Sequence, residues 1–230
     1  MTDDWSWEIQ GFLDSNSFVH PIDSDTKVIS TVFERMAAPV LRSIAKEFDY
    51  RVELANQTTY PDFTLTNDKV GHRIALDIKT TYKRPRMVFT LGGYNSFLRN
   101  NTKNIRYPYD TYNDHWVLGF VYTQLDHFTE YDLDNLPKPG EISCPYKVNA
   151  VFLREKHEMC GIRAGSGNTK NIGSFVGLAP ADFESVVGPF GGFTSGKEAC
   201  DHYWANYEKY CPVIGSAAQL LAHADFQRFR

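Results

Sequence analysis

Two acids and a lysine lie in the stretch "YPDFTLTNDKVGHRIALDIKTTY", residues 60–82. One residue separates Asp77 from Lys79, so both side chains project from the same face if this segment is a strand. Asp62 follows a proline at the other end of the stretch. An antiparallel hairpin through the polar turn between the two ends would bring its carboxylate beside that of Asp77.

This grouping of charges indicates a metal-assisted reaction. Two converging carboxylates repel each other unless a cation lies between them, and an incomplete shell of oxygen ligands suits Mg²⁺, with Mn²⁺ as a substitute. A lysine adds positive charge near metal-bound water and a phosphate, which is the chemistry of phosphodiester hydrolysis. Asp62 and Asp77 are thus candidate metal ligands, and Lys79 is a candidate catalytic group. The alternative is an ordinary ion pair between Asp77 and Lys79, with Asp62 a turn residue.

Hydrophobic patterning predicts the elements that would hold these side chains. Apolar residues recur at four-residue steps over residues 24–48, which predicts a helix with Ser24 as its N-cap and a kink or break at Pro39. Strands are expected where β-branched and aromatic residues are dense, at 50–54, 62–65, 72–82, 87–91, 116–125 and 146–155. An α/β fold follows from this mixture.

The remaining segments indicate connections and a helical C-terminal part. Residues 126–147 hold several prolines among acids, and residues 163–174 are rich in Gly, Ser, Asn and Thr, so both are predicted to be loops. A length of 230 residues favours one domain, 1–230. Within it we expect a core over about 24–174 and a helical subdomain over about 195–230.

Composition and charge exclude several classes of protein. The formal net charge is −4, yet the segment from Lys69 to Tyr109 holds nine basic residues against one acid, or +8, so one surface could face phosphates. The N-terminus is acidic and no apolar run reaches the roughly 18 to 20 residues of a membrane span, so a cytoplasmic protein without membrane contact is expected. The four cysteines and seven histidines have no metal-ligand spacing, and we expect reduced thiols and structural or surface histidines.

Seven ordered segments carry a resemblance to a known family. They are "SDTKVISTVFE", "YPDFTL", "LDIKTTY", "FTLGGYNSF", "RNNTKNI", "AGSGNT" and "NIGS". In order and spacing they resemble the EcoRV family of type II restriction endonucleases, within the PD-(D/E)xK nuclease superfamily. The resemblance runs from about Ser24 to Ser174, "DHYWANYEKY" extends it into the helical C-terminal part, and the last twenty residues diverge.

The resemblance implies a fold, an activity and partners. The fold would be a restriction-endonuclease-like mixed β-sheet flanked by helices, with a small C-terminal helical part. The enzyme would be a homodimer that uses Mg²⁺ to cut duplex DNA at a short palindrome, in a cell that holds a cognate DNA methyltransferase. Asp62 and Asp77 would bind the metal, and Lys79 would orient or activate water. Glu34 would be an auxiliary carboxylate for the metal, its alternative being a solvated helix acid.

Two segments are candidates for reading the DNA bases. In "AGSGNTKN", glycines allow close approach of the backbone, Asn168 can bond adenine and the Thr169 methyl can pack on thymine, although a surface turn is the alternative. The resemblance makes this the major-groove loop and implies GATATC, cut in the centre to leave blunt ends. Its base-reading residues would be Gly165, Ser166, Gly167, Asn168 and Thr169.

The second segment, "ANQTTYPDF", departs further from the family pattern of a Gln/Asn-rich minor-groove loop. Asn56, Gln57 and Thr58 are its candidate contacts, with altered flank preference expected before a new site. Phosphate contacts, which fix register without reading sequence, are expected from Thr80, Ser96, Lys103 and Lys170.

Two other functions are compatible with the motif. A repair or recombination nuclease of the same superfamily would recognise DNA structure or damage. A non-catalytic DNA-binding protein would keep the fold without the chemistry, although it would have no reason to retain a carboxylate pair.

Overall fold

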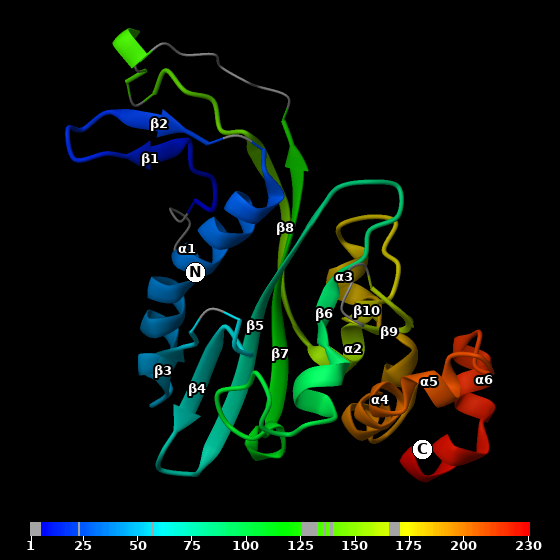
Figure 1. Ribbon diagram of the computed structural model, residues 1–230. Helices are drawn as coiled ribbons and strands as arrows, with labels where there is room; N and C mark the ends of the chain where they lie inside the picture. The colour runs from blue at the N-terminus through cyan, green and yellow to red at the C-terminus, as the bar shows by residue number, and fades with distance from the viewer. Residues whose placement is uncertain are drawn as a thin grey trace.

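The computed structural model describes residues 6–22, 24–56, 58–125, 133–135, 137–138, 140–165 and 171–230. Its central sheet has five strands: β3 (Arg51–Leu54), β4 (Phe63–Asn67), β5 (His72–Tyr82), β7 (Asp114–Gln124) and β8 (Tyr146–Glu155). They lie in the order β3-β4-β5-β7-β8 (Figure 1). β5 and β7 run parallel and the other neighbours antiparallel, so the predicted mixed sheet is confirmed.

The long helix α1 (Thr26–Glu47) begins one residue later than a Ser24 N-cap predicts. Its N-cap is Asp25, whose carboxylate accepts hydrogen bonds from two backbone N–H groups of the first turn, at 2.8 and 3.3 Å. The prediction of Ser24 as N-cap is therefore wrong. A carboxylate at this position also interacts favourably with the positive end of the helix dipole. The helix continues through Pro39, so the alternative of a break at this residue is wrong.

α1 covers one face of the central sheet. Phe33 of the helix stacks on Phe120 of β7, with ring centroids 4.3 Å apart, and both side chains are fully buried. Leu76 and Ile78 of β5 belong to the same core. Because alternate residues of a strand face opposite sides, Asp77 between them points away from this core.

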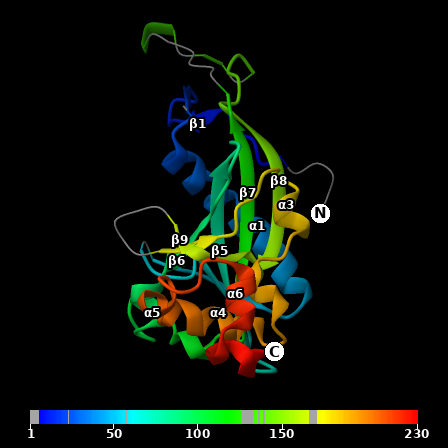
Figure 2. The same ribbon diagram turned by 90° about the vertical axis from the view of Figure 1, so that its right-hand side faces the viewer.

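The other face of the sheet carries a smaller sheet and the C-terminal helices (Figures 1 and 2). The small sheet consists of β6 (Thr90–Gly93), β9 (Cys160–Ala164) and β10 (Asn171–Ser174), antiparallel in the order β6-β10-β9. Its side chains share one core with β7, β8 and the C-terminal helices. Trp204 of α4 (Gly196–Ala205) is the largest side chain of this core.

Two sequence predictions change in this region. Of the strand predicted at 87–91, only Thr90 and Leu91 belong to a strand, β6, which continues to Gly93. Met87 forms an isolated bridge to Gly177. The loop predicted at 163–174 is strand at both ends, in β9 and β10. Residues 166–170 lie outside the described residues.

The remaining elements are short. β1 (Gly11–Leu13) and β2 (Val19–Pro21) form a two-stranded ribbon. The other helical turns are η1 (Tyr94–Leu98), η2 (Tyr109–Thr111), η3 (Leu133–Asn135), α2 (Lys156–Met159), α3 (Asp182–Ser185), η4 (Pro189–Gly192), α5 (Tyr207–Tyr210), α6 (Ala217–Ala222) and η5 (Ala224–Phe229). Among the described residues, no helix combines the length and apolar character needed to cross a membrane.

Candidate active site

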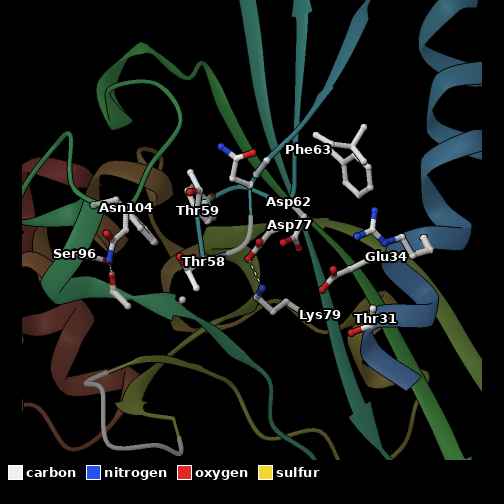
Figure 3. Close-up of a pocket in the computed structure, with 18 residues that line it drawn as sticks. Thr31, Glu34, Thr58, Thr59, Asp62, Phe63, Asp77, Lys79, Ser96 and Asn104 are labelled. Atoms are coloured by element: carbon white, nitrogen blue, oxygen red, sulfur yellow. Dashed lines mark hydrogen bonds and ion pairs between the residues drawn. The ribbon is translucent and has the colours of Figure 1, made fainter. Parts of the chain in front are cut away.

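The β4–β5 hairpin sets the position of both acids. Its register pairs Phe63 with Leu76, so one residue further along the hairpin Asp62 comes level with Asp77 (Figure 3). The predicted antiparallel pairing is confirmed. Burial of the apolar face favours this register, since a slip of one residue would turn Ile78 out of the core and Asp77 into it.

Short polar contacts hold the three charged groups. The Lys79 ammonium lies 2.5 Å from Asp77 Oδ2 and donates to the carbonyl of Ile78 at 3.0 Å. Asp62 Oδ2 accepts a hydrogen bond from the Ile78 N–H at 2.6 Å. Asp77 is only 5% exposed, so its carboxylate contacts protein atoms more than bulk water.

The electrostatics of the group favour a bound cation. Burial and the neighbouring charge of Asp77 raise the pKa of Asp62 to about 8. Burial lowers the pKa of Lys79, but Asp77 and Asp62 outweigh burial and raise it overall. Burial is also the main cause of the raised pKa of Glu34. One ammonium thus faces three carboxyl groups, and ionising all three would leave an excess of negative charge that a divalent cation would neutralise.

These groups lie at a cleft of about 640 Å³ between α1 and η1 (Figure 3). The predicted site residues that line it are Glu34, Asn56, Thr58, Asp62, Asp77, Lys79 and Ser96. Glu34 enters from α1, whereas the two aspartates and the lysine enter from the hairpin. The fold therefore gathers side chains from four separate segments at one opening.

Other predicted residues lie elsewhere or are not described. Thr80 follows Lys79 on β5, and Lys103 is exposed in the turn after η1, where its N–H donates to the Asn100 carbonyl at 2.8 Å. Neither residue lines the cleft. The predicted contacts Gln57, Ser166, Gly167, Asn168, Thr169 and Lys170 lie outside the described residues.

Gly165 links the predicted reading loop to the cleft. Its N–H donates to the Asn171 carbonyl at 2.9 Å, which closes the end of the β9–β10 pair. A Cβ at this position would lie 3.2 Å from Thr90 Oγ1, so only a small residue fits comfortably against β6. β6 ends in Gly92 and Gly93, both of which line the cleft.

Sequence reasoning missed several residues of the cleft. Thr31 and Arg35 line it beside Glu34, and Thr31 could have been found because residues three apart share a helix face. Asn104 also lines it, with a left-handed φ of 56° that asparagine tolerates better than most residues. Its position in an Asn/Thr-rich stretch was the available signal.

A buried lysine beneath the cleft was also missed. Lys156 is 5% exposed, and its ammonium lies 4.7 Å from the ring centre of Phe97 and 5.0 Å from that of Tyr60. Such a cation over aromatic faces is stabilised by the ring quadrupoles. Tyr60, whose hydroxyl lies 2.8 Å from His115 Nδ1, immediately precedes Pro61 and Asp62. The stack thus supports the backbone that carries Asp62.

The carboxylate donors suit a hard cation such as Mg²⁺ or Mn²⁺ better than a metal that prefers nitrogen or sulfur ligands. Within the described residues, no three His, Cys, Asp or Glu side chains are grouped closely enough to hold an ion on their own. Mg²⁺ commonly uses one or two carboxylates and keeps water on its other positions. The convergence of Asp62 and Asp77 at an open cleft therefore fits this ion.

A mixed sheet whose hairpin presents two aspartates and a lysine to a wide cleft defines a nuclease of the restriction-endonuclease class. The family model of restriction endonuclease EcoRV matches residues 3–229. The type II restriction enzyme EcoRV of Escherichia coli is 43% identical over 212 residues, which cover 88% of this chain and 83% of that enzyme. The chain belongs to the EcoRV family of type II restriction endonucleases. This membership decides against a repair nuclease and against a non-catalytic DNA-binding protein.

Proposed function

We propose that this enzyme hydrolyses both strands of duplex DNA at a short palindrome, with GATATC as the leading candidate and central cleavage that leaves blunt ends. The observation that carries the proposal is the convergence of Asp62, Asp77 and Lys79 at a cleft, in a member of this family. The segment "AGSGNT", which resembles the major-groove loop of the family, supports the choice of site. A TA step at the centre would also bend at low cost.

Asp62 and Asp77 are the proposed ligands of Mg²⁺, with Glu34 as an auxiliary ligand and Mn²⁺ as a substitute ion. When bound, the metal polarises the scissile phosphate and lowers the pKa of attacking water. Asp77 has a second role, because its carboxylate holds the Lys79 ammonium at 2.5 Å. Lys79 is therefore oriented before DNA binds and can donate to attacking water or to the phosphate as negative charge develops.

Base reading is assigned to two loops. Gly165, Ser166, Gly167, Asn168 and Thr169 would contact base edges in the major groove. Asn56, Gln57 and Thr58 would lie at the minor groove, where donors and acceptors distinguish A·T from T·A poorly. The second loop is thus expected to affect flank preference and coupling more than the identity of the site.

Phosphate contacts are assigned to Thr80, Ser96, Lys103 and Lys170, which would fix the register of the duplex. A palindrome presents two identical half-sites, so the enzyme would act as a two-fold homodimer with one cleft on each strand. Such an enzyme endangers the DNA of its own cell. A methyltransferase that protects the same site is the expected partner, and the cytoplasm is the expected place of action.

Sequencing the ends of digested genomic DNA tests this proposal. With Mg²⁺ or Mn²⁺ present, we expect discrete fragments whose ends share half of GATATC and carry no overhang. Ends at another single palindrome would refute the assigned site but keep the enzyme class. Ends without a common sequence would refute the proposed specificity altogether.

A further inference from the structure

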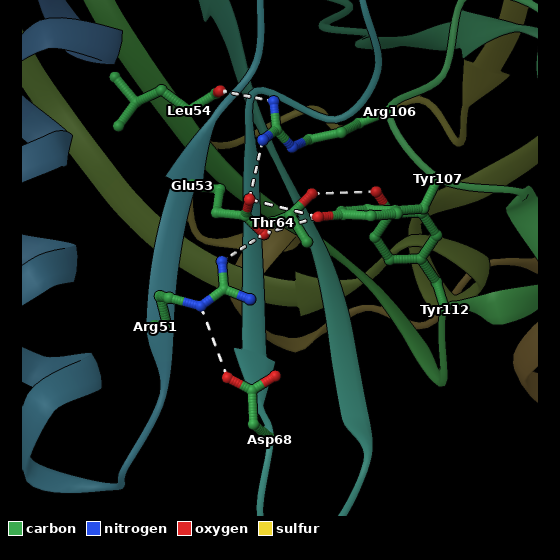
Figure 4. A network of polar contacts seen from close by, with 8 residues as sticks. All are labelled: Arg51, Glu53, Leu54, Thr64, Asp68, Arg106, Tyr107 and Tyr112. Atoms are coloured by element: carbon green, nitrogen blue, oxygen red, sulfur yellow. Dashed lines mark hydrogen bonds and ion pairs between the residues drawn. The ribbon is translucent and has the colours of Figure 1, made fainter.

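Glu53, on the edge strand β3, is the centre of a polar cluster (Figure 4). Its carboxylate lies 2.8 Å from a guanidinium nitrogen of Arg51 and 2.8 Å from one of Arg106, and it accepts from the Tyr107 hydroxyl at 3.0 Å. Burial raises the pKa of Glu53, but hydrogen bonds from Arg106, Arg51 and Tyr107 outweigh burial and lower it overall. The ionised carboxylate therefore joins Arg51 of its own strand to Arg106 and Tyr107, which lie about fifty residues further along the chain.

Arg106 contacts both ends of the segment that we call the cleft loop, residues 55–60. Its guanidinium donates to the carbonyl of Leu54, just before the loop, at 3.4 Å. Its backbone N–H donates to the carbonyl of Tyr60, the last residue of the loop, at 2.9 Å. The Tyr60 N–H in turn donates to the Asn104 carbonyl at 2.9 Å. One residue thus joins both ends of the loop to the segment that follows η1.

The cleft loop needs such support because part of its backbone is unfavourable. Thr58 has a φ of 69°, in the left-handed region that β-branched residues rarely adopt. Such a residue keeps its conformation only when its surroundings hold it. Both Thr58 and Asn56 line the cleft, on the same opening as Asp62. A shift of the loop would therefore displace its side chains relative to the hydrolytic group.

We propose that Arg106, oriented by Glu53, is a positioning residue that fixes the cleft loop and thereby sets how strictly the enzyme discriminates among DNA sequences. This inference rests on the proposed function, in which the loop faces the minor groove. Arg106 acts through the loop at both of its ends. Glu53 acts indirectly, because its carboxylate orients the guanidinium of Arg106.

Arg51 offers a matched control on the same carboxylate. It lies at the same 2.8 Å from Glu53, and its second acidic partner is Asp68, at 3.5 Å. Its side chain is half exposed, and it does not line the cleft. Arg51→Met and Arg106→Met therefore each remove one arginine from Glu53, but only the second also removes the side-chain hydrogen bond to the Leu54 carbonyl at the start of the loop. The backbone bond from residue 106 to Tyr60 remains in both variants.

The first measurement compares cleavage of the preferred site in its preferred flanking sequence with cleavage of the same site after the flanking base pairs are exchanged. We expect Arg106→Met to lower the ratio of the two kcat/KM values about tenfold, because a displaced loop no longer favours one geometry. Arg51→Met should leave the ratio within about twofold of the wild type. Arg106→Lys keeps a cation beside Glu53 and should restore part of the ratio.

The second measurement is hydrogen exchange of the free protein, which does not depend on activity. The Tyr60 and Arg106 amides should exchange faster in Arg106→Met and unchanged in Arg51→Met, since both amides close the loop. Equal ratios and equal exchange in the two methionine variants would overturn the inference while wild-type cleavage left the proposed function intact. A wild-type enzyme that cuts no DNA would instead refute the proposed function, and with it the role of Arg106 in discrimination.

Discussion

At the scale of single residues, Asp62 and Asp77 are held closer than their charges favour. Both carboxylates are largely removed from water, and one ammonium, that of Lys79, is shared between them. Such a cluster of buried charges is typical of a functional site, where a bound cation and a phosphate would balance the charges of the two carboxylates and the ammonium. These residues could be predicted from the sequence because charges in an otherwise apolar strand stand out.

The raised pKa of Asp62 makes the stability of the metal-free protein depend on pH. Its folded pKa, about 8, exceeds the ordinary value of 3.8, so the folded state binds the extra proton and loses stability as pH rises from about 4 to about 8. Asp62→Asn removes this charge. We expect the variant to be more stable than the wild type at pH 8, by on the order of 1 to 3 kcal/mol, and the difference to shrink toward pH 4.

Urea unfolding without divalent metal, from pH 4 to pH 8, measures this difference. Asp68→Asn removes an exposed acid and serves as the control, with no comparable trend. If Asp62→Asn were equally or less stable than the wild type at pH 8, the carboxylates would not repel each other as described.

Lys156 marks the limit of prediction for single residues. A lysine is expected to be exposed, and nothing adjacent to it in sequence indicates burial. The burial of its ammonium group is stabilised by the aromatic rings of Tyr60, Phe97 and Tyr109, which only the folded chain brings together. The sequence could not reveal such a contact, since no local period connects these residues.

At the scale of elements, local patterns predicted the hairpin and the long helix but not the small sheet. β4 and β5 are adjacent in sequence, alternate apolar with polar residues and enclose a turn. β6 and β10, in contrast, are about eighty residues apart, short and rich in glycine, so neither shows a clear period of two. Their pairing depends on the core beneath them rather than on their own sequences.

The N-terminus of α1 gives a prediction at this scale. Asp25→Ala removes the carboxylate that binds two N–H groups and should lower the free energy of unfolding by about 1 kcal/mol. Ser24→Ala should change it by less than about 0.5 kcal/mol, because Ser24 contributes its backbone carbonyl, which accepts from Gln124 at 2.7 Å. Urea unfolding at neutral pH compares the two variants. A larger loss of unfolding free energy for Ser24→Ala than for Asp25→Ala would indicate that Ser24 is the N-cap, as predicted from the sequence.

At the scale of the whole molecule, the small sheet connects the proposed reading loop to the hydrolytic group. β10 pairs with both β9 and β6, and the glycines at the end of β6 line the cleft that contains Asp77. Gly165, whose N–H donates to the Asn171 carbonyl at 2.9 Å, is therefore connected to the cleft through β10 and β6.

The proposed dimer predicts how the two strands are cut. A dimer with one wild-type and one Asp77→Ala subunit has one working cleft, so it should nick a single strand of its site. With supercoiled plasmid as substrate, we expect open circles to accumulate, whereas the wild-type dimer yields linear DNA. Linear DNA at the wild-type rate from the mixed dimer would contradict the assignment of one cleft to each strand.

The most direct test of the hydrolytic centre is single-turnover cleavage of a duplex with one GATATC site, in Mg²⁺, by the wild type and by Asp77→Asn. The substitution keeps the shape of the side chain but removes a proposed metal ligand and the charged partner of Lys79. We predict a rate at least about a thousandfold lower in a variant that unfolds cooperatively like the wild type. Cleavage by Asp77→Asn at the wild-type rate would contradict the account.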